Sequence, residues 1–225
     1  MKLINKINSM SRKRQTVLYT AIILLFVIVK LFFAEGCYTS PEAVMFACEK
    51  GLHYGPSEKV LHVERQGRNA LVIGKCSDGL SSVPATKKLL FWELGYDGDG
   101  TYVEGHIQTD GIEAVYDKRF HAIYGRSMLD DVESVRVVIG EYENGEPKKL
   151  AEVMFDEVDS DGFFWDSSVM SYIDTDENMW PEAVEIEGFD KDGNSIYMHS
   201  LEGTEIFDSD GELIYSDLDN IRGAE

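Results

Sequence analysis

The sequence predicts an α+β protein that is mostly β, built from an N-terminal transmembrane helix, a small helix-plus-antiparallel-sheet module and a β-sandwich-like module. Three observations lead to this fold class. An apolar run from Val17 to Phe33 follows a basic N-terminus, a short helix signal follows at residues 40–51, and the remaining chain alternates short apolar segments with Asp- and Gly-rich turns. A run of this length suits a membrane span, and short segments between turns are typical of antiparallel sheets.

The N-terminal segment sets the expected location of the chain. Residues 1–15 carry five Lys or Arg and no acid, and residues 16–34 contain only one charged side chain, Lys30. Lys30 lies near the outer end of the run, where its long stem can carry the ammonium group to the lipid headgroups. Because Lys- and Arg-rich flanks stay on the cytoplasmic side, we expect a cytoplasmic tail at 1–15, a single-pass helix at 16–34 in the cell membrane, and a C-terminal domain outside.

Two other fates of this segment stay open. A signal peptidase could cleave before Cys37, because Ala34 and Gly36 are small residues at the positions that it requires, although the apolar run is longer than that of an ordinary signal peptide. Cys37 could instead accept a lipid, but Glu35 fits that motif poorly. All three alternatives place residues 38–225 outside the cytoplasm.

The module at residues 38–108 is expected to begin with a helix. Ser40 suits the N-cap, Pro41 suits the first helical position, and Gly51 can end the helix in the left-handed conformation. Strands are then expected at residues 59–64, 70–73, 89–94 and 101–106, with a turn at 66–68. The expected module is one short amphipathic helix on a small antiparallel sheet.

The module at residues 112–225 is expected to contain strands and turns without a long helix. Candidate strands lie at residues 113–116, 120–124, 134–139, 150–155, 163–165, 183–189, 195–199, 204–207 and 212–215. Short strands at this spacing favour a sandwich of two sheets. The pattern of this second half of the chain resembles bacterial immunoglobulin-like (Ig-like) extracellular modules, particularly in residues 183–194, with the sequence Ala-Val-Glu-Ile-Glu-Gly-Phe-Asp-Lys-Asp-Gly-Asn.

The layout of the whole chain resembles the uncharacterised single-pass, membrane-anchored extracytoplasmic proteins of Gram-positive bacteria such as bacilli. Membership of that group implies no activity.

An Asp-x-Asp-Gly pattern occurs four times, at residues 97–100, 159–162, 190–193 and 208–211. Asp favours turn initiation through its side-chain acceptor, and Gly supplies a positive φ, so the pattern predicts hairpin turns. Calcium binding is the alternative, because closely spaced carboxylates suit a hard cation. The candidate ligands are Asp190, Asp192, Asp208 and Asp210, but no copy ends with the glutamate of a 12-residue EF-hand loop.

The cysteines leave two alternatives open. Cys48 falls on the expected helix and Cys76 at the end of an expected strand, so a disulfide could join them if the helix packs on that sheet in an oxidising compartment. Two separately buried thiols explain the same residues.

The charge distribution argues against a nucleic-acid partner. The formal net charge is −20, and only one of the 41 acidic residues lies in the first 37 positions, which hold six of the 21 basic residues. Binding to a phosphate backbone needs a basic face, and the outer part of the chain is strongly acidic. The acidic excess has two explanations: solubility, which net charge supports most directly, or attraction of a cation or a basic envelope protein.

The sequence shows no pattern for catalysis or for a resident cofactor. It contains no His-Glu-x-x-His and no Cys-x-x-Cys. We therefore expect a noncatalytic binding or adaptor module of the cell envelope, held at the membrane by its N-terminal helix. An envelope hydrolase is the enzymatic alternative, because a pair of catalytic carboxylates is defined by its separation in space and not by spacing in the sequence. A calcium-responsive surface protein is the third alternative.

Overall fold

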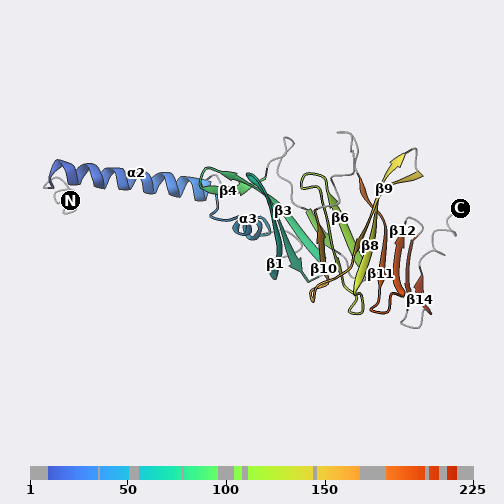
Figure 1. Cartoon of the computed structure of the whole chain (residues 1–225). Helices are drawn as coiled ribbons and strands as arrows, with labels where there is room; N and C mark the ends of the chain where they lie inside the picture. The colour runs from blue at the N-terminus through green and yellow to red at the C-terminus, as the bar shows by residue number, and fades with distance from the viewer. Residues whose placement is uncertain are drawn as a thin grey trace.

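The computed structural model describes residues 10–34, 36–50, 56–77, 79–95, 104–107, 111–143, 146–167, 181–200, 203–207 and 212–216. Within these residues, a long helix, α2 (Arg12–Ala34), stands away from a body made of three antiparallel sheets and the short helix α3 (Pro41–Cys48) (Figure 1). The layers follow the order α3, five-stranded sheet, three-stranded sheet, six-stranded sheet. The prediction of an α+β fold that is mostly β is confirmed.

Helix α2 exposes its apolar side chains on every side. Residues Ile22–Val29 are eight consecutive large apolar residues, and their exposed fractions range from 37% to 71%. Successive residues of an α-helix point about 100° apart, so eight in a row surround the helix axis. Among the residues whose side chains the structure describes, which in α2 end at Lys30, no helix is long and apolar enough to cross a membrane.

Helix α3 begins as its sequence predicts. Ser40 has an extended backbone and its Oγ accepts a hydrogen bond from the backbone N of Ala43, while Pro41 occupies the first turn. The helix ends at Cys48, before Gly51, which lies outside the described residues. Val44 and Met45 are buried against the five-stranded sheet, so this amphipathic helix forms the first layer of the body.

The five-stranded sheet is buried on both faces. Its strands are β1 (Lys59–Gln66), β2 (Asn69–Cys76), β3 (Gly79–Lys88), β4 (Phe91–Leu94) and β5 (Glu104–Ile107), paired in the order β1-β2-β3-β4 with β5 also on β3. In β2, Ala70 and Val72 pack with α3, whereas Leu71 and Ile73 pack toward the three-stranded sheet. This alternation follows from the two-residue period of a strand.

Strand β3 was not among the expected strands. Its residues include Gly79, two serines and Pro84, which are typical of turns. Tertiary contacts compensate for them: Ser82 Oγ accepts a hydrogen bond from the buried Tyr124 hydroxyl at 3.0 Å. The expected strand at 89–94 is also shorter, because Leu89 and Leu90 form the turn that joins β3 to β4.

The three-stranded sheet lies between the other two sheets. Its strands β6 (Ile112–Asp117), β7 (Ala122–Ser127) and β10 (Phe163–Asp166) pair in the order β10-β7-β6. Ile123 and Phe164 belong to the core shared with the six-stranded sheet, whereas Tyr124 and Phe163 belong to the core shared with β2 and β3. Side chains from both predicted modules therefore meet in one hydrophobic cluster.

The six-stranded sheet closes the stack. Its strands are β8 (Ser134–Glu143), β9 (Glu146–Phe155), β11 (Glu182–Phe189), β12 (Ser195–Ser200), β13 (Gly203–Phe207) and β14 (Leu213–Ser216), paired in the order β14-β13-β12-β11-β8-β9. Val135, Val137 and Ile139 of β8 face the core, while Arg136 pairs with Glu185 and Glu187 of β11. The packing of this sheet on the three-stranded sheet confirms a β-sandwich-like arrangement.

All nine strands expected after residue 112 are present, with shifted ends. The largest shifts are in β8, which ends at Glu143 and not at residue 139, and in β9, which begins at Glu146 and not at residue 150. Strand β7 begins at Ala122 and not at Phe120. His121 has a φ of +48° and belongs to the turn before the strand, and residues with positive φ cannot continue an extended strand.

Candidate functional site

The Asp-x-Asp-Gly pattern forms the same turn at the two copies that the structure describes completely. At residues 190–193, Asp190 Oδ1 accepts from the backbone N of Asp192 at 2.9 Å and of Asn194 at 2.8 Å. At residues 159–162, Asp159 Oδ1 accepts in the same way from Asp161 and Phe163, at 2.7 and 2.9 Å. The glycine of each copy has a positive φ, as the turn prediction requires.

The two turns differ in what they connect. Residues 190–193 join β11 to its neighbour β12, which is the hairpin that the sequence predicts. Residues 159–162 instead precede β10 and carry the chain from the six-stranded to the three-stranded sheet, so the hairpin prediction is wrong for this copy. The turn chemistry is local, whereas the pairing of the flanking strands depends on the whole fold. The copies at 97–100 and 208–211 lie outside the described residues.

The candidate calcium ligands are only partly within the described chain. Both carboxylate oxygens of Asp190 accept hydrogen bonds from the turn itself, with Oδ2 receiving Asn194 Nδ2 at 3.0 Å. The bond from the Asn194 side chain is the largest cause that lowers the pKa of Asp190, followed by backbone bonds. Asp192 is exposed at the same turn, and Asp208 and Asp210 lie outside the described residues. Within those residues, no three His, Cys, Asp or Glu side chains are grouped so that they could hold a metal ion.

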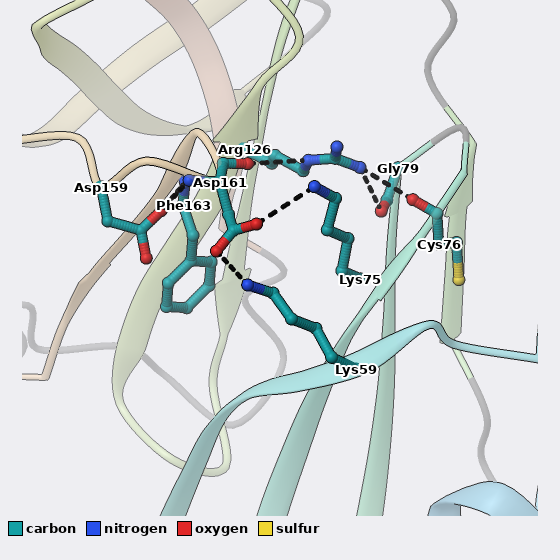
Figure 2. A network of polar contacts seen from close by, with 8 residues as sticks. All are labelled: Lys59, Lys75, Cys76, Gly79, Arg126, Asp159, Asp161 and Phe163. Atoms are coloured by element: carbon teal, nitrogen blue, oxygen red, sulfur yellow. Dashed lines mark hydrogen bonds and ion pairs between the residues drawn. The ribbon is translucent and has the colours of Figure 1, made fainter.

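Four charged side chains meet where the five-stranded sheet packs on the three-stranded sheet (Figure 2). They are Lys59 of β1, Lys75 of β2, Arg126 of β7 and Asp161 of the 159–162 turn, and we call this group the sheet junction. Lys59 and Lys75 are directly opposite each other in the β1–β2 pairing. Like charges at such positions repel each other, so a carboxylate between the two ammonium groups stabilises the strand pairing.

Asp161 supplies that carboxylate. Its Oδ2 pairs with Lys59 Nζ, and its Oδ1 accepts from Lys75 Nζ at 3.1 Å. The side chain of Asp161 is 18% exposed, compared with 49% for Lys59 and 23% for Lys75. The hydrogen bond from Lys59, followed by that from Lys75, lowers the pKa of Asp161 below its ordinary value of 3.8.

Arg126 completes the sheet junction through backbone carbonyls. Its Nη1 donates to the carbonyl oxygens of Cys76 and Gly79 at 2.9 and 3.0 Å, and its Nε donates to that of Asp161 at 3.1 Å. The side chain is buried, at 7% exposure. One guanidinium therefore bonds the β2–β3 connection on one sheet and the 159–162 turn on the other, which suits the fixed fork of an arginine.

A second polar group lies next to the sheet junction. Glu49 follows α3, is buried, and accepts from the Ser57 hydroxyl at 2.6 Å and from the Ser57 backbone N at 2.8 Å. Ser57 Oγ is 3.7 Å from Cys76 Sγ. These contacts bond the end of α3 to β2.

Helix α3 carries Cys48 and strand β2 carries Cys76, the two cysteines for which the sequence leaves a disulfide open. Cys37 and Cys76 are buried and Cys48 is half-buried. Among the residues described, no disulfide joins Cys48 to Cys76. Burial, together with the neighbouring Glu49 carboxylate, raises the pKa of the Cys48 thiol.

Sequence patterns did not identify the sheet junction. Asp161 belongs to the repeated turn, but nothing in its copy separates it from Asp192. One indication of the sheet junction was present in the sequence, because Arg126 is the one charged residue in the segment Ala122–Ser127. The arrangement can hold the two sheets together. The charged groups of the sheet junction bond to one another and to backbone carbonyls. We therefore assign the sheet junction a structural role, which is to hold the two sheets in place.

We expect Asp161→Asn to lower the melting temperature of the protein at neutral pH and to have less effect in acid. The lowered pKa of Asp161 means that the carboxylate stabilises the fold above the unfolded value, near 3.8, and that this contribution is lost as the pH falls through the folded value. Thermal unfolding at several values between about pH 7 and pH 3 tests this. Asp192→Asn is the matched control, because Asp192 occupies the same place in an exposed turn. A loss that does not change with pH would contradict the role of the charge.

No protein-family model, curated protein or solved structure matches this chain.

Proposed function

We propose that this chain is a noncatalytic binding or adaptor module of the cell envelope, held at the cell membrane by helix α2 with its C-terminal domain outside. The observation that carries the proposal is the exposure of Ile22–Val29 around the whole helix. A helix that is apolar on all sides is stable inside a large protein core or in lipid, and the body of this protein does not cover α2 (Figure 1).

The sequence of α2 supports a span with a defined direction. Helix α2 has 23 residues, a length of about 35 Å at 1.5 Å per residue, which compares with a hydrocarbon core of about 30 Å. Arg12, Lys13 and Arg14 begin the helix, and from Gln15 to Ala34 the sequence holds Lys30 as its one charged residue. The basic end belongs on the cytoplasmic side by the positive-inside rule.

The fate of Cys37 in this proposal follows from its burial. Its side chain is only 1% exposed. A lipid on its sulfur would require that side chain to leave the protein interior, so an uncleaved anchor is the form that we propose. Mass spectrometry of the N-terminus tests this, because a mature chain that begins at Cys37 would refute it.

The binding role rests on an edge of the six-stranded sheet. Strand β14 ends the pairing order of that sheet among the described strands, and its Leu213 and Ile214 are 53% and 68% exposed. Such an edge can accept an extended segment of a partner as an additional strand. The proposed Ig-like character of residues 112–225 is supported by the packing of two antiparallel sheets around one core.

The anchor is tested by membrane fractionation of the full chain. We expect it to remain with membranes in alkaline carbonate and to be released by detergent, because α2 spans the bilayer. The double variant Ile23→Asp, Phe26→Asp should move the protein to the soluble fraction, since each acid near the centre of a span costs about 3 kcal/mol. The control is Leu213→Asp, which changes an exposed apolar residue of the body. Release of the unchanged chain by carbonate would contradict the anchor.

The binding edge needs a separate test. Envelope proteins that copurify with the detergent-solubilised chain should be lost with Ile214→Lys, because a lysine on an edge strand opposes the addition of another strand. Met154→Lys is the control, since Met154 is exposed on β9, at the other end of the same sheet. A partner retained equally by both variants would contradict binding at β14.

A further inference from the structure

Two leucines form the exposed end of the β3–β4 hairpin. Lys88 pairs with Phe91 across the two strands, so Leu89 and Leu90 make a two-residue turn. Their exposed fractions are 85% and 82%, more than those of the other exposed large apolar residues of the described chain. Burial in the protein therefore does not account for leucine at either position.

Turn chemistry does not account for these leucines either. Leu89 has a φ of +58°, in the left-handed region that L residues other than Asn and Asp rarely adopt. Two-residue hairpin turns favour Gly, Asn or Asp at such positions. Leu89 therefore disfavours folding in two ways, through its exposed apolar side chain and through its positive φ. A strained residue of this kind points to a role in binding.

The hairpin end lies near the end of helix α2. Tyr38, four residues beyond Ala34, forms an antiparallel bridge with Trp92 of β4. The backbone N of Tyr38 donates to the carbonyl of Trp92 at 2.6 Å, and the backbone N of Trp92 donates to that of Tyr38 at 2.7 Å. Figure 1 shows β4 beside the end of α2 at which the body begins. Only Phe91 lies between Leu90 and Trp92, so the hairpin end can reach the surface of a bilayer that contains α2.

The neighbouring charges suit lipid headgroups. Lys87 and Lys88 directly precede the two leucines in a chain whose formal net charge is −20. Lys87 Nζ lies 5.8 Å from the centre of the Trp92 ring, and Lys88 pairs with Glu93 at 3.3 Å. Because Glu93 offsets part of this positive charge, the leucines provide the main contact with the membrane. The lysines reduce the repulsion between the acidic body and anionic lipid headgroups at this place.

We propose that Leu89 and Leu90 insert into the interfacial layer of the same bilayer that α2 spans, with Lys87 and Lys88 among the headgroups. This inference rests on the proposed anchor and adds a second membrane contact. One spanning helix does not by itself fix the tilt of the body relative to the membrane, whereas a second contact fixes which face of the body looks away from it. It would hold the β14 edge away from the lipid, since β14 lies on the far side of the body from α2 (Figure 1).

Depth-dependent quenching of tryptophan tests the proposal with the full chain. Leu90→Trp and Ile214→Trp are each reconstituted into phosphatidylcholine vesicles whose acyl chains are brominated near the headgroup, and into vesicles without bromine. Both positions are exposed, so neither substitution disturbs the core, and the unchanged chain provides the signal of the native tryptophans. We expect the fluorescence added by Leu90→Trp to be largely lost in brominated vesicles, and that added by Ile214→Trp to be retained.

Each outcome bears on a separate step of the argument. Equal retention in both variants, with the protein floating with the vesicles, would overturn the hairpin contact and leave the anchor intact. A blue-shifted but unquenched Leu90→Trp signal that grows with protein concentration would show a second copy of this chain at the hairpin, and would also overturn the proposal. Failure of the unchanged chain to float with vesicles would overturn the anchor, and the hairpin contact with it.

Discussion

Arg126→Met should lower the free energy of unfolding by about 3–5 kcal/mol, the largest loss that we expect from a single polar side chain of this protein. The substitution keeps the volume of the side chain roughly constant but removes three hydrogen bonds to the carbonyls of Cys76, Gly79 and Asp161. These carbonyls lie at the packed boundary between two sheets, so they lose a charged donor where water has little access. Urea unfolding of the full chain in a mild detergent, followed by tryptophan fluorescence, measures the change.

Two further variants separate the geometry of Arg126 from its charge. Arg126→Lys keeps the charge but has a single ammonium that cannot bond all three carbonyls at once, so it should recover only part of the loss. Arg65→Met removes a cation whose side chain is 57% exposed and 3.4 Å from Glu42, and should change the unfolding free energy by less than about 1 kcal/mol. If Arg126→Met were no more destabilising than Arg65→Met, the sheet junction would not hold the two sheets together.

Gly162→Ala should be much more destabilising than Gly193→Ala, although the two glycines occupy the same position of the same turn. Their φ values are +78° and +82°, so an alanine costs about 1 kcal/mol at either site through the backbone alone. A Cβ on Gly193 meets no atom within 4 Å, whereas a Cβ on Gly162 would lie 2.1 Å from the carbonyl oxygen of Ser127. Relief of that overlap requires β7 to move from the turn, which adds about 1–3 kcal/mol.

The comparison has an internal check. The backbone N of Ser127 donates to the carbonyl of Gly162 at 2.8 Å, so movement of the turn from β7 should increase hydrogen exchange at Ser127 in Gly162→Ala and leave it unchanged in Gly193→Ala. Denaturation midpoints of both variants provide the energies. Equal losses in the two variants would mean that the 159–162 turn does not depend on its close contact with β7.

Much of the secondary structure could be predicted because it depends on local signals. Ser40 and Pro41 mark the start of α3, and alternating apolar residues mark the strands after residue 112. Strand β3 was not predicted, because its strand conformation depends on tertiary contacts and not on local signals. Its serines and Pro84 indicate a turn locally, and only the packing of β3 between β2 and β4, with Tyr124 bonded to Ser82, makes it a strand.

The candidate site was much less predictable than the strands. Lys59 and Asp161 are 102 positions apart, and no local pattern brings them together. Asp161 and Asp192 occupy the same position of the Asp-x-Asp-Gly pattern, yet only Asp161 bonds two lysines of another sheet. The sequence correctly assigned both to turns, but it could not show which turn packs against a second sheet.

The sequence was sufficient to predict the types and order of the local elements: one apolar helix behind a basic tail, one capped helix, and short strands between Asp- and Gly-rich turns. These features depend on the conformational preferences of a few neighbouring residues, and local physics is sufficient for them. The tertiary structure alone decided that the sheets stack in three layers, that Arg126 and Asp161 join two of them, and that Leu89 and Leu90 occupy an exposed turn beside the end of α2. Such contacts depend on long-range packing, where distant segments compete to bury the same apolar surface and to satisfy the same polar groups.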